Sequence, residues 1–261
     1  MRRSPRGFVG STQGVFGDET PLFRQLLEGS LTLKDYYTSY YRDTLGLPEW
    51  QELVQQRCEY EGEVTRLFRF LKLVDVRSHP GIVLNVGCGT GGFNRVALSY
   101  GVRTIGIDSN HNALIADAFH GVLGVSEELP FRSGEFLGVY CFSVIEHVAS
   151  VVDSIREMVR VTRPGGAIYI HTPNAWSWYE GHYKVPWVPF MPQWLGRMHL
   201  RMRGRPTAYL ATIRRLTRET LIRAFQSAGV MDLTFYDVDP ARNRVSRSLG
   251  VAPYLEVVAR V

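Results

Sequence analysis

The chain has 261 residues, of which 45% are hydrophobic and 21% are charged. This composition is typical of a globular protein with one large domain, or one domain with an appendage, and it excludes disordered, collagen-like and coiled-coil chains. The formal net charge is +5, and no apolar run of about 18 residues predicts a membrane-spanning helix.

The N-terminus and the cysteines narrow the expected location and chemistry. The first residues are basic but lead into Gly, Ser and Thr without an apolar stretch, which argues against a secretory signal and makes the cytoplasm the expected location. The three cysteines, Cys58, Cys88 and Cys141, are odd in number and widely spaced, so they fit neither a disulfide framework nor a zinc site. We expect them to be buried or to line a site, and the sequence predicts no metal centre.

The positive charge is confined to the last third of the chain. Residues 174–261 hold 13 basic and 6 acidic side chains, whereas residues 1–173 hold 17 basic and 19 acidic ones. Seven arginines between Arg197 and Arg218 have no acidic residue among them. The charge therefore characterises a C-terminal segment rather than the whole molecule.

The first 80 residues are predicted to form an arm and a helical cap. Residues 1–20 are rich in Gly, Ser and Thr, which is typical of a loose arm. Apolar residues then recur at helical spacing from Pro21 to Leu73. The segment Arg77–Gly81 contains Pro and Gly and ends this helical pattern. We therefore divide the chain into an arm and cap at 1–80 and a main domain at 81–261.

The main domain alternates between strand and helix patterns. We expect strands at 82–86, 103–107, 122–125, 138–144 and 167–171, with helices at 91–100, 110–119 and 146–161 between them. A helix at 218–227 and two last strands, at 231–238 and 255–261, complete the domain. This alternation predicts an α/β fold in which helices cover both faces of a parallel sheet.

The turn after the first strand of this domain is rich in glycine. Such a turn lets the backbone approach a ligand closely, and the helix that follows offers free N–H groups. Gly87, Gly89 and Gly92 fit the pattern G-x-G-x-x-G, while Gly87, Gly89 and Gly91 equally fit G-x-G-x-G, so the spacing does not choose between cofactors. Asp108, at the end of the second strand, either accepts hydrogen bonds from ribose hydroxyls or caps the next helix.

Residues 82–261 resemble the class I S-adenosylmethionine (SAM)-dependent methyltransferases, in particular the small-molecule branch that is similar to quinone-biosynthesis methylases. The resemblance implies SAM as the cofactor, lying across the carboxyl ends of strands one, two and four. It also implies a Rossmann-like seven-stranded sheet in the order 3-2-1-4-5-7-6 with strand seven antiparallel. The residues that carry it are Leu84–Gly91, Asp108, Glu127–Phe131, Cys141–Val148, Arg163–Gly166 and Thr172–Asn174.

The resemblance also implies roles for individual residues. In the glycine-rich turn, Gly87, Cys88 and Gly89 would line the methionine part of SAM, and Asn85 and Gly91 flank them. Asp108 would bind the ribose, Ser109 would border the adenine, Ser126 and Glu127 would lie at the adenine edge, and Ser143 and Val144 would lie beside the sulfonium.

Three positions depart from the family pattern. Asn85 keeps a hydrogen-bond acceptor but lacks the usual negative charge, and Val125 and Leu137 stand where acids are common.

Two histidines are candidates for a general base. His147 follows strand four and His171 ends strand five, and the pKa of histidine suits proton abstraction near neutral pH. Because SAM carries an activated methyl group, a base is useful but not obligatory. For both histidines the alternative is a structural role.

The aromatic insertion at 174–210 follows strand five and holds four of the five tryptophans. It interrupts the fold where the ligand crevice opens, so we interpret it as a lid over the acceptor. On a helical wheel Met191, Trp194, Leu195, Met198 and Met202 form one stripe beside Arg197 and Arg201. The stripe suits either a lid helix packed on the domain or peripheral membrane contact through residues 191–205.

The sequence therefore predicts an enzyme that methylates a small-molecule or lipid-like acceptor. Oxygen is favoured as the methylated atom. The arginines of the C-terminal segment favour an anionic or lipid-linked acceptor. One alternative is an NAD(P)-dependent oxidoreductase, which the literal glycine spacing allows. The other is a catalytically silent, SAM-binding scaffold subunit, which the departures at Asn85, Val125 and Leu137 motivate. Nucleic acid is not an expected partner, since no Asn/Asp-Pro-Pro-aromatic motif follows strand four.

Overall fold

The computed structural model describes residues 32–76, 79–115, 121–236 and 252–261. The predicted arm, residues 21–31 of the predicted cap, the end of the 110–119 helix and the end of the 231–238 strand lie outside the described residues. Among the helices that are described, none combines the length and hydropathy that crossing a membrane requires.

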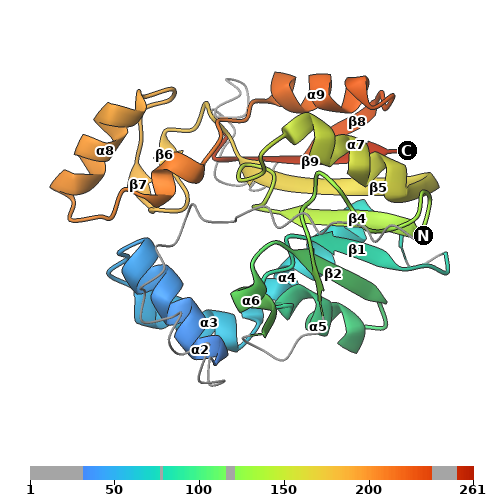
Figure 1. Cartoon of the computed structure of the whole chain (residues 1–261), viewed down its shortest axis with the longest axis horizontal. Coiled ribbons are helices and arrows are strands. Elements are labelled where there is room, and N and C mark those ends of the chain that lie inside the picture. The colour runs from blue at the N-terminus through green and yellow to red at the C-terminus, as the bar shows by residue number, and fades with distance from the viewer. Residues whose placement is uncertain (1–31, 77–78, 116–120, 237–251) are drawn as a thin grey trace, which may run out of the picture. The chain divides into compact units, whose positions relative to one another are not determined.

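A seven-stranded sheet forms the centre of the main domain (Figure 1). Its neighbours pair in parallel except β9, which runs antiparallel to both β5 and β8. Two further short strands form a separate hairpin, so the order matches the predicted 3-2-1-4-5-7-6. In sheet order the strands are β3 (Val122–Leu123), β2 (Thr104–Asp108), β1 (Val83–Val86), β4 (Phe136–Phe142), β5 (Thr162–Pro173), β9 (Tyr254–Arg260) and β8 (Asp232–Tyr236).

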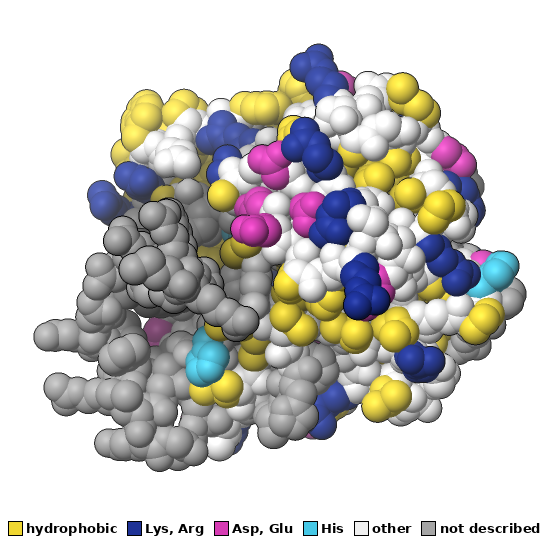
Figure 2. Space-filling model, turned by 45° about the vertical axis from the view of Figure 1, so that its right-hand side comes forward, with side chains coloured by type: hydrophobic (Ala, Val, Ile, Leu, Met, Phe, Trp, Pro, Cys, Tyr) yellow, Lys and Arg dark blue, Asp and Glu magenta, His cyan; other side chains and the backbone are white. Residues whose placement is uncertain are grey.

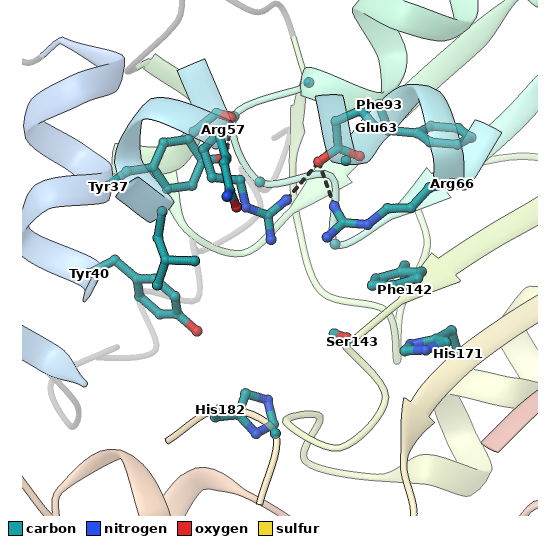
Figure 3. A pocket seen from close by; sticks show the side chains of 18 of the residues that line it. Tyr37, Tyr40, Arg57, Glu63, Arg66, Phe93, Phe142, Ser143, His171 and His182 are labelled. Atoms are coloured by element: carbon teal, nitrogen blue, oxygen red, sulfur yellow. Dashed lines mark hydrogen bonds and ion pairs between the residues drawn. The ribbon is translucent and has the colours of Figure 1, made fainter. Parts of the chain in front are cut away.

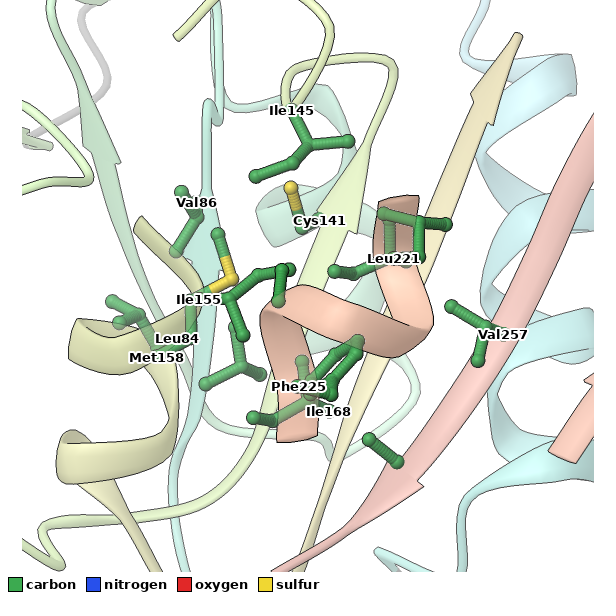
Figure 4. Packing of buried hydrophobic residues seen from close by; sticks show 14 of the residues in the cluster. Leu84, Val86, Cys141, Ile145, Ile155, Met158, Ile168, Leu221, Phe225 and Val257 are labelled. Atoms are coloured by element: carbon green, nitrogen blue, oxygen red, sulfur yellow. The ribbon is translucent and has the colours of Figure 1, made fainter. Parts of the chain in front are cut away.

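Helices α7 (Val151–Val161) and α9 (Arg218–Ser227) cover one face of the sheet (Figure 4). Ile155 of α7 and Phe225 of α9 are fully buried against strand residues such as Ile168. Alternate residues of each strand face this core, because successive side chains of a strand point to opposite faces. All four residues of β1 are buried, as a central parallel strand requires.

Helices α4 (Glu61–Leu73) and α5 (Gly92–Ser99) cover the other face, and α6 (His111–Ile115) lies beside β2. The core here is aromatic: Phe93 stacks on Tyr140 with ring centroids 3.8 Å apart, and Phe70 meets Tyr140 edge to face. The predicted helical cap therefore supplies one of the two helices on this face of the sheet.

Helix α7 begins later than the sequence pattern predicts. We expected a helix from Glu146, but α7 starts at Val151, where the Ser150 side chain accepts a hydrogen bond from the Asp153 backbone N–H. Glu127 accepts hydrogen bonds from the backbone N–H groups of Ala149 and Ser150. These contacts hold residues 144–150 as a turn, so Glu146 is free to point inward instead of lying on a helix.

The rest of the cap packs against the aromatic insertion. The cap segment comprises α2 (Leu33–Thr38), the π-helix η1 (Ser39–Thr44) and α3 (Trp50–Cys58), and the insertion comprises β6 (Tyr179–Glu180), β7 (Val185–Pro186), α8 (Gln193–Met202) and the 3₁₀ helix η2 (Tyr209–Thr212). Leu45 and Val54 from the cap share a buried cluster with Tyr183 and Leu200 from the insertion. This cluster joins two segments far apart in the sequence, and Figure 1 shows them at the same end of the sheet, the cap helices α2 and α3 below and the insertion above.

Candidate active site

A cavity of about 780 Å³ opens at the carboxyl ends of β1, β4 and β5. Gly87, Ser143 and His171 lie where these strands end, and helices of the cap form the opposite wall. Figure 3 shows Tyr40, Ser143 and His182 around the same open space. The volume lies in the range of small-molecule sites.

The glycine-rich turn forms the floor of this cavity. The backbone N–H groups of Gly87 and Cys88 donate to the carbonyl of Ile107, which fixes the turn against β2. Gly87 has φ 70° and Gly89 has φ 54°, a region that favours glycine. A Cβ added to Gly89 would meet no atom of the described residues within 4 Å, so among them this side of the turn is open.

Asp108 braces the turn. Its Oδ2 accepts a hydrogen bond of 2.7 Å from the Gly89 N–H, and its Oδ1 accepts one of 2.8 Å from the Asn110 N–H. Burial raises the pKa of Asp108. Asp108 is partly buried and is not among the residues that line the cavity, and its hydrogen bonds orient Gly89 and the residue before the next helix.

The other residues predicted to bind the cofactor divide into two groups. Asn85, Cys88 and Ser143 line the cavity, and the buried Asn85 donates a 2.6 Å hydrogen bond to Asn94. The second group lies outside the cavity lining and consists of Gly91, Ser109, Ser126, Glu127 and Val144.

Two members of the second group hold neighbouring structure. The Ser126 hydroxyl lies 2.8 Å from that of Ser154, and Glu127 caps the turn that precedes α7.

Ser143 occupies an unusual backbone conformation. It has φ 55°, and its N–H donates to the His171 carbonyl at 2.8 Å. A non-glycine residue in this region stores strain, and such residues cluster at functional sites. The strained residue lies at the mouth of β4 and lines the cavity, which supports the prediction that the chemistry takes place here.

The two candidate bases differ in their access to the cavity. His171 lines it, is 5% exposed and, within the part of the chain that the structure describes, has no hydrogen-bond partner at Nδ1. Burial lowers its pKa to about 4. His147 does not line the cavity; its Nε2 lies 3.1 Å from the Tyr209 hydroxyl and its Nδ1 3.3 Å from Thr212. Burial also lowers the pKa of His147.

Charged side chains from the cap lie on the far wall. Arg57 and Arg66 both contact Glu63, at 2.7 and 2.5 Å, and Arg66 lies over the ring of Phe142 (Figure 3). Among the described residues, the Lys, Arg, Asp and Glu side chains that line the cavity are Arg57, Glu63, Arg66 and Lys184. Lys184 lies 3.4 Å from Glu49, whereas Arg57 and Arg66 share Glu63, so the described wall beside the two arginines is positive.

The insertion brings further polar groups to the same space. Two carboxylates, Glu146 and Glu180, flank His182, which lines the cavity. Burial opposes charge on His182, but these carboxylates raise its pKa to about 9. The insertion folds over the cavity and brings His182 to its lining. His199 instead lies against the Pro186 carbonyl.

Comparison with known proteins matches the central part of the chain to a family model. Residues 84–170 match the model described as a methyltransferase domain. A probable S-adenosylmethionine-dependent methyltransferase from Mycolicibacterium smegmatis is 30% identical over 67% of both chains. A malonyl-[acyl-carrier protein] O-methyltransferase from Serratia marcescens is 35% identical over 40% of this chain and 43% of that protein. The match therefore spans less than half the length of the Serratia relative.

Solved structures share the fold at low sequence identity. Phosphoethanolamine N-methyltransferase 2 from Haemonchus contortus, crystallised with SAM, aligns with a TM-score of 0.56 over 84% of this chain and 59% of its own, at 14% identity. A SAM-dependent methyltransferase from Archaeoglobus fulgidus aligns with a TM-score of 0.53 over 77% of this chain and 94% of its own, at 16% identity.

Proposed function

The chain belongs to the class I SAM-dependent methyltransferases, and we propose that it transfers the methyl group of SAM to an oxygen of a small, anionic acceptor held between the glycine-rich turn and the helical cap. The family membership decides against the oxidoreductase alternative. The observation that supports the proposal most directly is the single cavity that joins Gly87 and Gly89 on one side to the tyrosines and arginines of the cap on the other.

The turn at residues 87–89 fits SAM. The free space next to Gly89 lies beside a backbone that Asp108 and Ile107 hold in place, and a rigid turn of this kind accepts a ligand without reorganising. Gly87, Cys88, Gly89 and Ser143 would hold SAM, which supplies a methyl group on a positively charged sulfur. Asp108 would act mainly by orienting Gly89.

The remaining walls of the cavity suit an anionic acceptor with apolar surface. Tyr36, Tyr37 and Tyr40 offer aromatic faces, and Arg57 and Arg66 share the carboxylate of Glu63. A nucleophilic oxygen held here would attack the methyl carbon as the carbon–sulfur bond breaks, so the task of the protein is alignment and exclusion of water. His171 is neutral at pH 7 because of its lowered pKa, so it adds no charge that would repel the sulfonium.

Binding of S-adenosylhomocysteine tests the cofactor half of this proposal. Gly89→Ala places a methyl group in the free space of the turn, and Gly165→Ala is its matched control, because Gly165 also has a positive φ and open surroundings but does not line the cavity. We expect both variants to lose similar stability, on the order of 1–2 kcal/mol. Only Gly89→Ala should lose affinity, by tenfold or more in calorimetric titration. Equal affinity in both variants would contradict the assignment.

Turnover tests the acceptor half. Release of S-adenosylhomocysteine is measured with phenols, catechols, carboxylic acids and amines, each with and without a long alkyl chain, and mass spectrometry locates the new methyl group. We expect methylation of oxygen in anionic acceptors. Methylation of amines alone would refute the oxygen assignment, and bound cofactor without turnover in any class would favour the silent scaffold.

We also propose that the insertion contacts an anionic membrane, where a lipid-linked acceptor would be met. Helix α8 buries Gly196 and Leu200 against the domain and leaves Trp194 and Met202 exposed at 68% and 70%. Met191 precedes this helix and is buried, so it does not belong to the exposed stripe as the helical wheel suggested. Further exposed apolar side chains of the insertion are Trp176, Trp178, Val188, Phe190 and Met198.

Charge complementarity identifies the surface that this patch fits. Arg197, Arg201 and Arg203 are exposed on or directly after α8. Figure 2 shows hydrophobic side chains gathered at the upper left, with Lys and Arg side chains beside them. Helix α8 lies toward the same side in Figure 1. Exposed tryptophans flanked by arginines are typical of segments that lie in the headgroup region of anionic lipid.

Vesicle sedimentation tests this contact. The protein should bind phosphatidylglycerol-containing vesicles more tightly than pure phosphatidylcholine vesicles, and added salt should weaken the binding. Two double variants should weaken vesicle binding. One carries Trp194→Gln and Met202→Gln; the other carries Arg197→Gln and Arg201→Gln and should lose about fivefold for each arginine removed. Met231→Gln is the control, because Met231 is equally exposed but lies next to β8. Equal binding by control and patch variants would refute the proposal.

A further inference from the structure

Glu146 and His147, from the turn at 144–150 that precedes α7, converge beside the cavity with His182 from the insertion. Oε1 of Glu146 lies 3.6 Å from Nε2 of His182 and 3.9 Å from Nε2 of His147. One possible ligand atom from each residue lies within 4.8 Å of the others. The two distances from Oε1 are too long for hydrogen bonds. They are close to the spacing of about 3.4 Å between the ligands of a tetrahedral zinc ion with bonds of about 2.1 Å.

The burial and hydrogen bonding of Glu146 give a second observation on this cluster. Glu146 is fully buried. Its Oε2 accepts a 2.9 Å hydrogen bond from the Thr172 hydroxyl, whereas Oε1 has no hydrogen-bond partner among the described residues. A buried carboxylate is stabilised by a positive group and by hydrogen bonds to both of its oxygens, and Oε1 has an ion-pair partner in His182 at 3.6 Å but no hydrogen bond within the described part of the chain. Oε1 is also the atom that faces both imidazoles.

The second nitrogen of each imidazole already has a partner. His182 Nδ1 lies 2.9 Å from Oε1 of Glu180, and Oε2 of Glu180 accepts a 2.6 Å hydrogen bond from the Tyr183 N–H. His147 Nδ1 lies 3.3 Å from the Thr212 hydroxyl. Metal-binding histidines are held in this way, with one nitrogen on an outer carboxylate or hydroxyl and the other toward the ion. At His147 the Nε2 atom also lies 3.1 Å from the Tyr209 hydroxyl, a contact that a bound ion would replace.

We propose that Glu146, His147 and His182 bind a divalent transition-metal ion at the edge of the cavity. Two imidazoles and one carboxylate suit zinc, iron(II) or manganese(II) rather than calcium or magnesium, which prefer oxygen ligands. The sequence predicted no metal centre, because its cysteines do not have the spacing of a zinc site. The proposed site leaves no pattern in the sequence, since 34 residues separate His147 from His182 and only the fold of the insertion brings them together.

The site lies toward the acceptor. His182 and Tyr40 line the cavity, and the Tyr209 hydroxyl, 3.1 Å from His147 Nε2, accepts a hydrogen bond from Tyr40. An ion held by three protein ligands keeps a further position for an exchangeable oxygen. On the proposed function, that position would hold the oxygen of the anionic acceptor. Metal binding itself does not depend on that function.

Metal titration of the full chain tests the proposal. After treatment with chelator and desalting, the protein is titrated with Zn²⁺ alone by calorimetry, and with Co²⁺ alone while visible absorption is recorded. We expect one equivalent of each ion, displacement of Co²⁺ by Zn²⁺, and cobalt bands typical of nitrogen and oxygen ligands. No stoichiometric binding, or cobalt bands typical of thiolate ligands, would overturn the proposal.

Variants assign the ligands. His182→Gln and His147→Gln should weaken Zn²⁺ binding by more than about 100-fold, and Glu180→Gln should weaken it by about 10–100-fold because Glu180 orients His182. His199→Gln is the matched control from the same insertion and should bind as the unmodified protein does. Circular dichroism and thermal melting of each variant, recorded without metal, separate ligand loss from misfolding. Undiminished binding by folded His182→Gln would refute the assignment.

Binding of S-adenosylhomocysteine to the metal-free protein is measured in parallel. Cofactor binding without metal binding would overturn this inference and leave the proposed function standing. Metal binding without cofactor binding would support the metal site and count against the proposed function.

Discussion

The imidazole of His171 lies parallel to the ring of Phe142, with ring centroids 4.0 Å apart, and stacks on Tyr254 on its other side. Burial in this stack lowers its pKa from the ordinary 6.5 to about 4. Between these values the unfolded chain binds a proton that the folded chain does not. The stabilising effect of the neutral imidazole is therefore complete above pH 6.5 and is lost as the pH falls toward 4.

His171→Phe should flatten this part of the stability profile, since phenylalanine stacks without titrating. For the unmodified protein, His171 should account for a loss on the order of 3 kcal/mol in the free energy of unfolding between pH 7 and pH 4. Urea denaturation at a series of pH values measures the difference between the two proteins. His199→Gln is the control and should keep the original slope. An unchanged slope in His171→Phe would show that His171 does not carry the effect.

A buried ion pair fastens the cap to the last strand. Arg69 of α4 contacts Glu256 of β9 at 2.5 Å, and Glu256, which is 1% exposed, also accepts a 2.6 Å hydrogen bond from Tyr169. Arg69→Met leaves a buried carboxylate with reduced compensation, so we expect it to lower the free energy of unfolding by about 3 kcal/mol. Adding Glu256→Gln should restore part of this loss, because the buried group is then neutral.

The surface pair between Arg156 and Asp153 provides the comparison for that prediction. Both side chains are about half exposed and lie 2.6 Å apart. Arg156→Met should change the free energy of unfolding by less than about 1 kcal/mol. Equal losses for Arg69→Met and Arg156→Met in urea denaturation would mean that burial of Glu256 does not determine the effect.

The hydroxyl of Tyr37 links α2 to the glycine-rich turn through a 2.9 Å hydrogen bond with Thr90. Removing this hydroxyl in Tyr37→Phe keeps the aromatic stack with Tyr41 but releases the turn. A net hydrogen bond contributes about 1 kcal/mol, so affinity for S-adenosylhomocysteine should fall about fivefold. Tyr100→Phe, at an exposed position after α5, should leave the affinity unchanged. A Tyr37→Phe variant that binds as tightly as Tyr100→Phe would contradict this link.

The sheet could be predicted from the sequence because each strand and helix carries its own local signal. The apolar run before Gly87 and the regular alternation after it predict the strands, the helices and a parallel sheet. The order of the strands in the sheet came from the resemblance to the SAM-dependent methyltransferases. The hairpin β6–β7 could not be predicted, because strands of two residues are too short for any periodicity. The late start of α7 depends on Glu127, which contacts Ala149 and Ser150 from a distant loop.

The candidate site was less predictable than the sheet. The glycines and Ser143 belong to local motifs and were found, whereas Arg57 and His182 reach the cavity only through packing of the cap against the insertion. A helical wheel identifies the apolar stripe of α8 but not the side that faces the domain. Close packing of Gly196 on Trp187 and Leu210 determines that side, and it leaves Trp194 exposed.

Packing behind the glycine-rich turn gives the last prediction. A Cβ on Gly87 would overlap the side chain of Val144, and φ at Gly87 is 70°. Gly87→Ala should therefore combine a backbone penalty of about 1–2 kcal/mol with an overpacking penalty of about 1–3 kcal/mol. In a Val144→Ala background the overlap disappears and only the backbone penalty should remain. Urea denaturation of the four proteins gives the coupling between the two sites. A coupling near zero would mean that Val144 does not limit position 87.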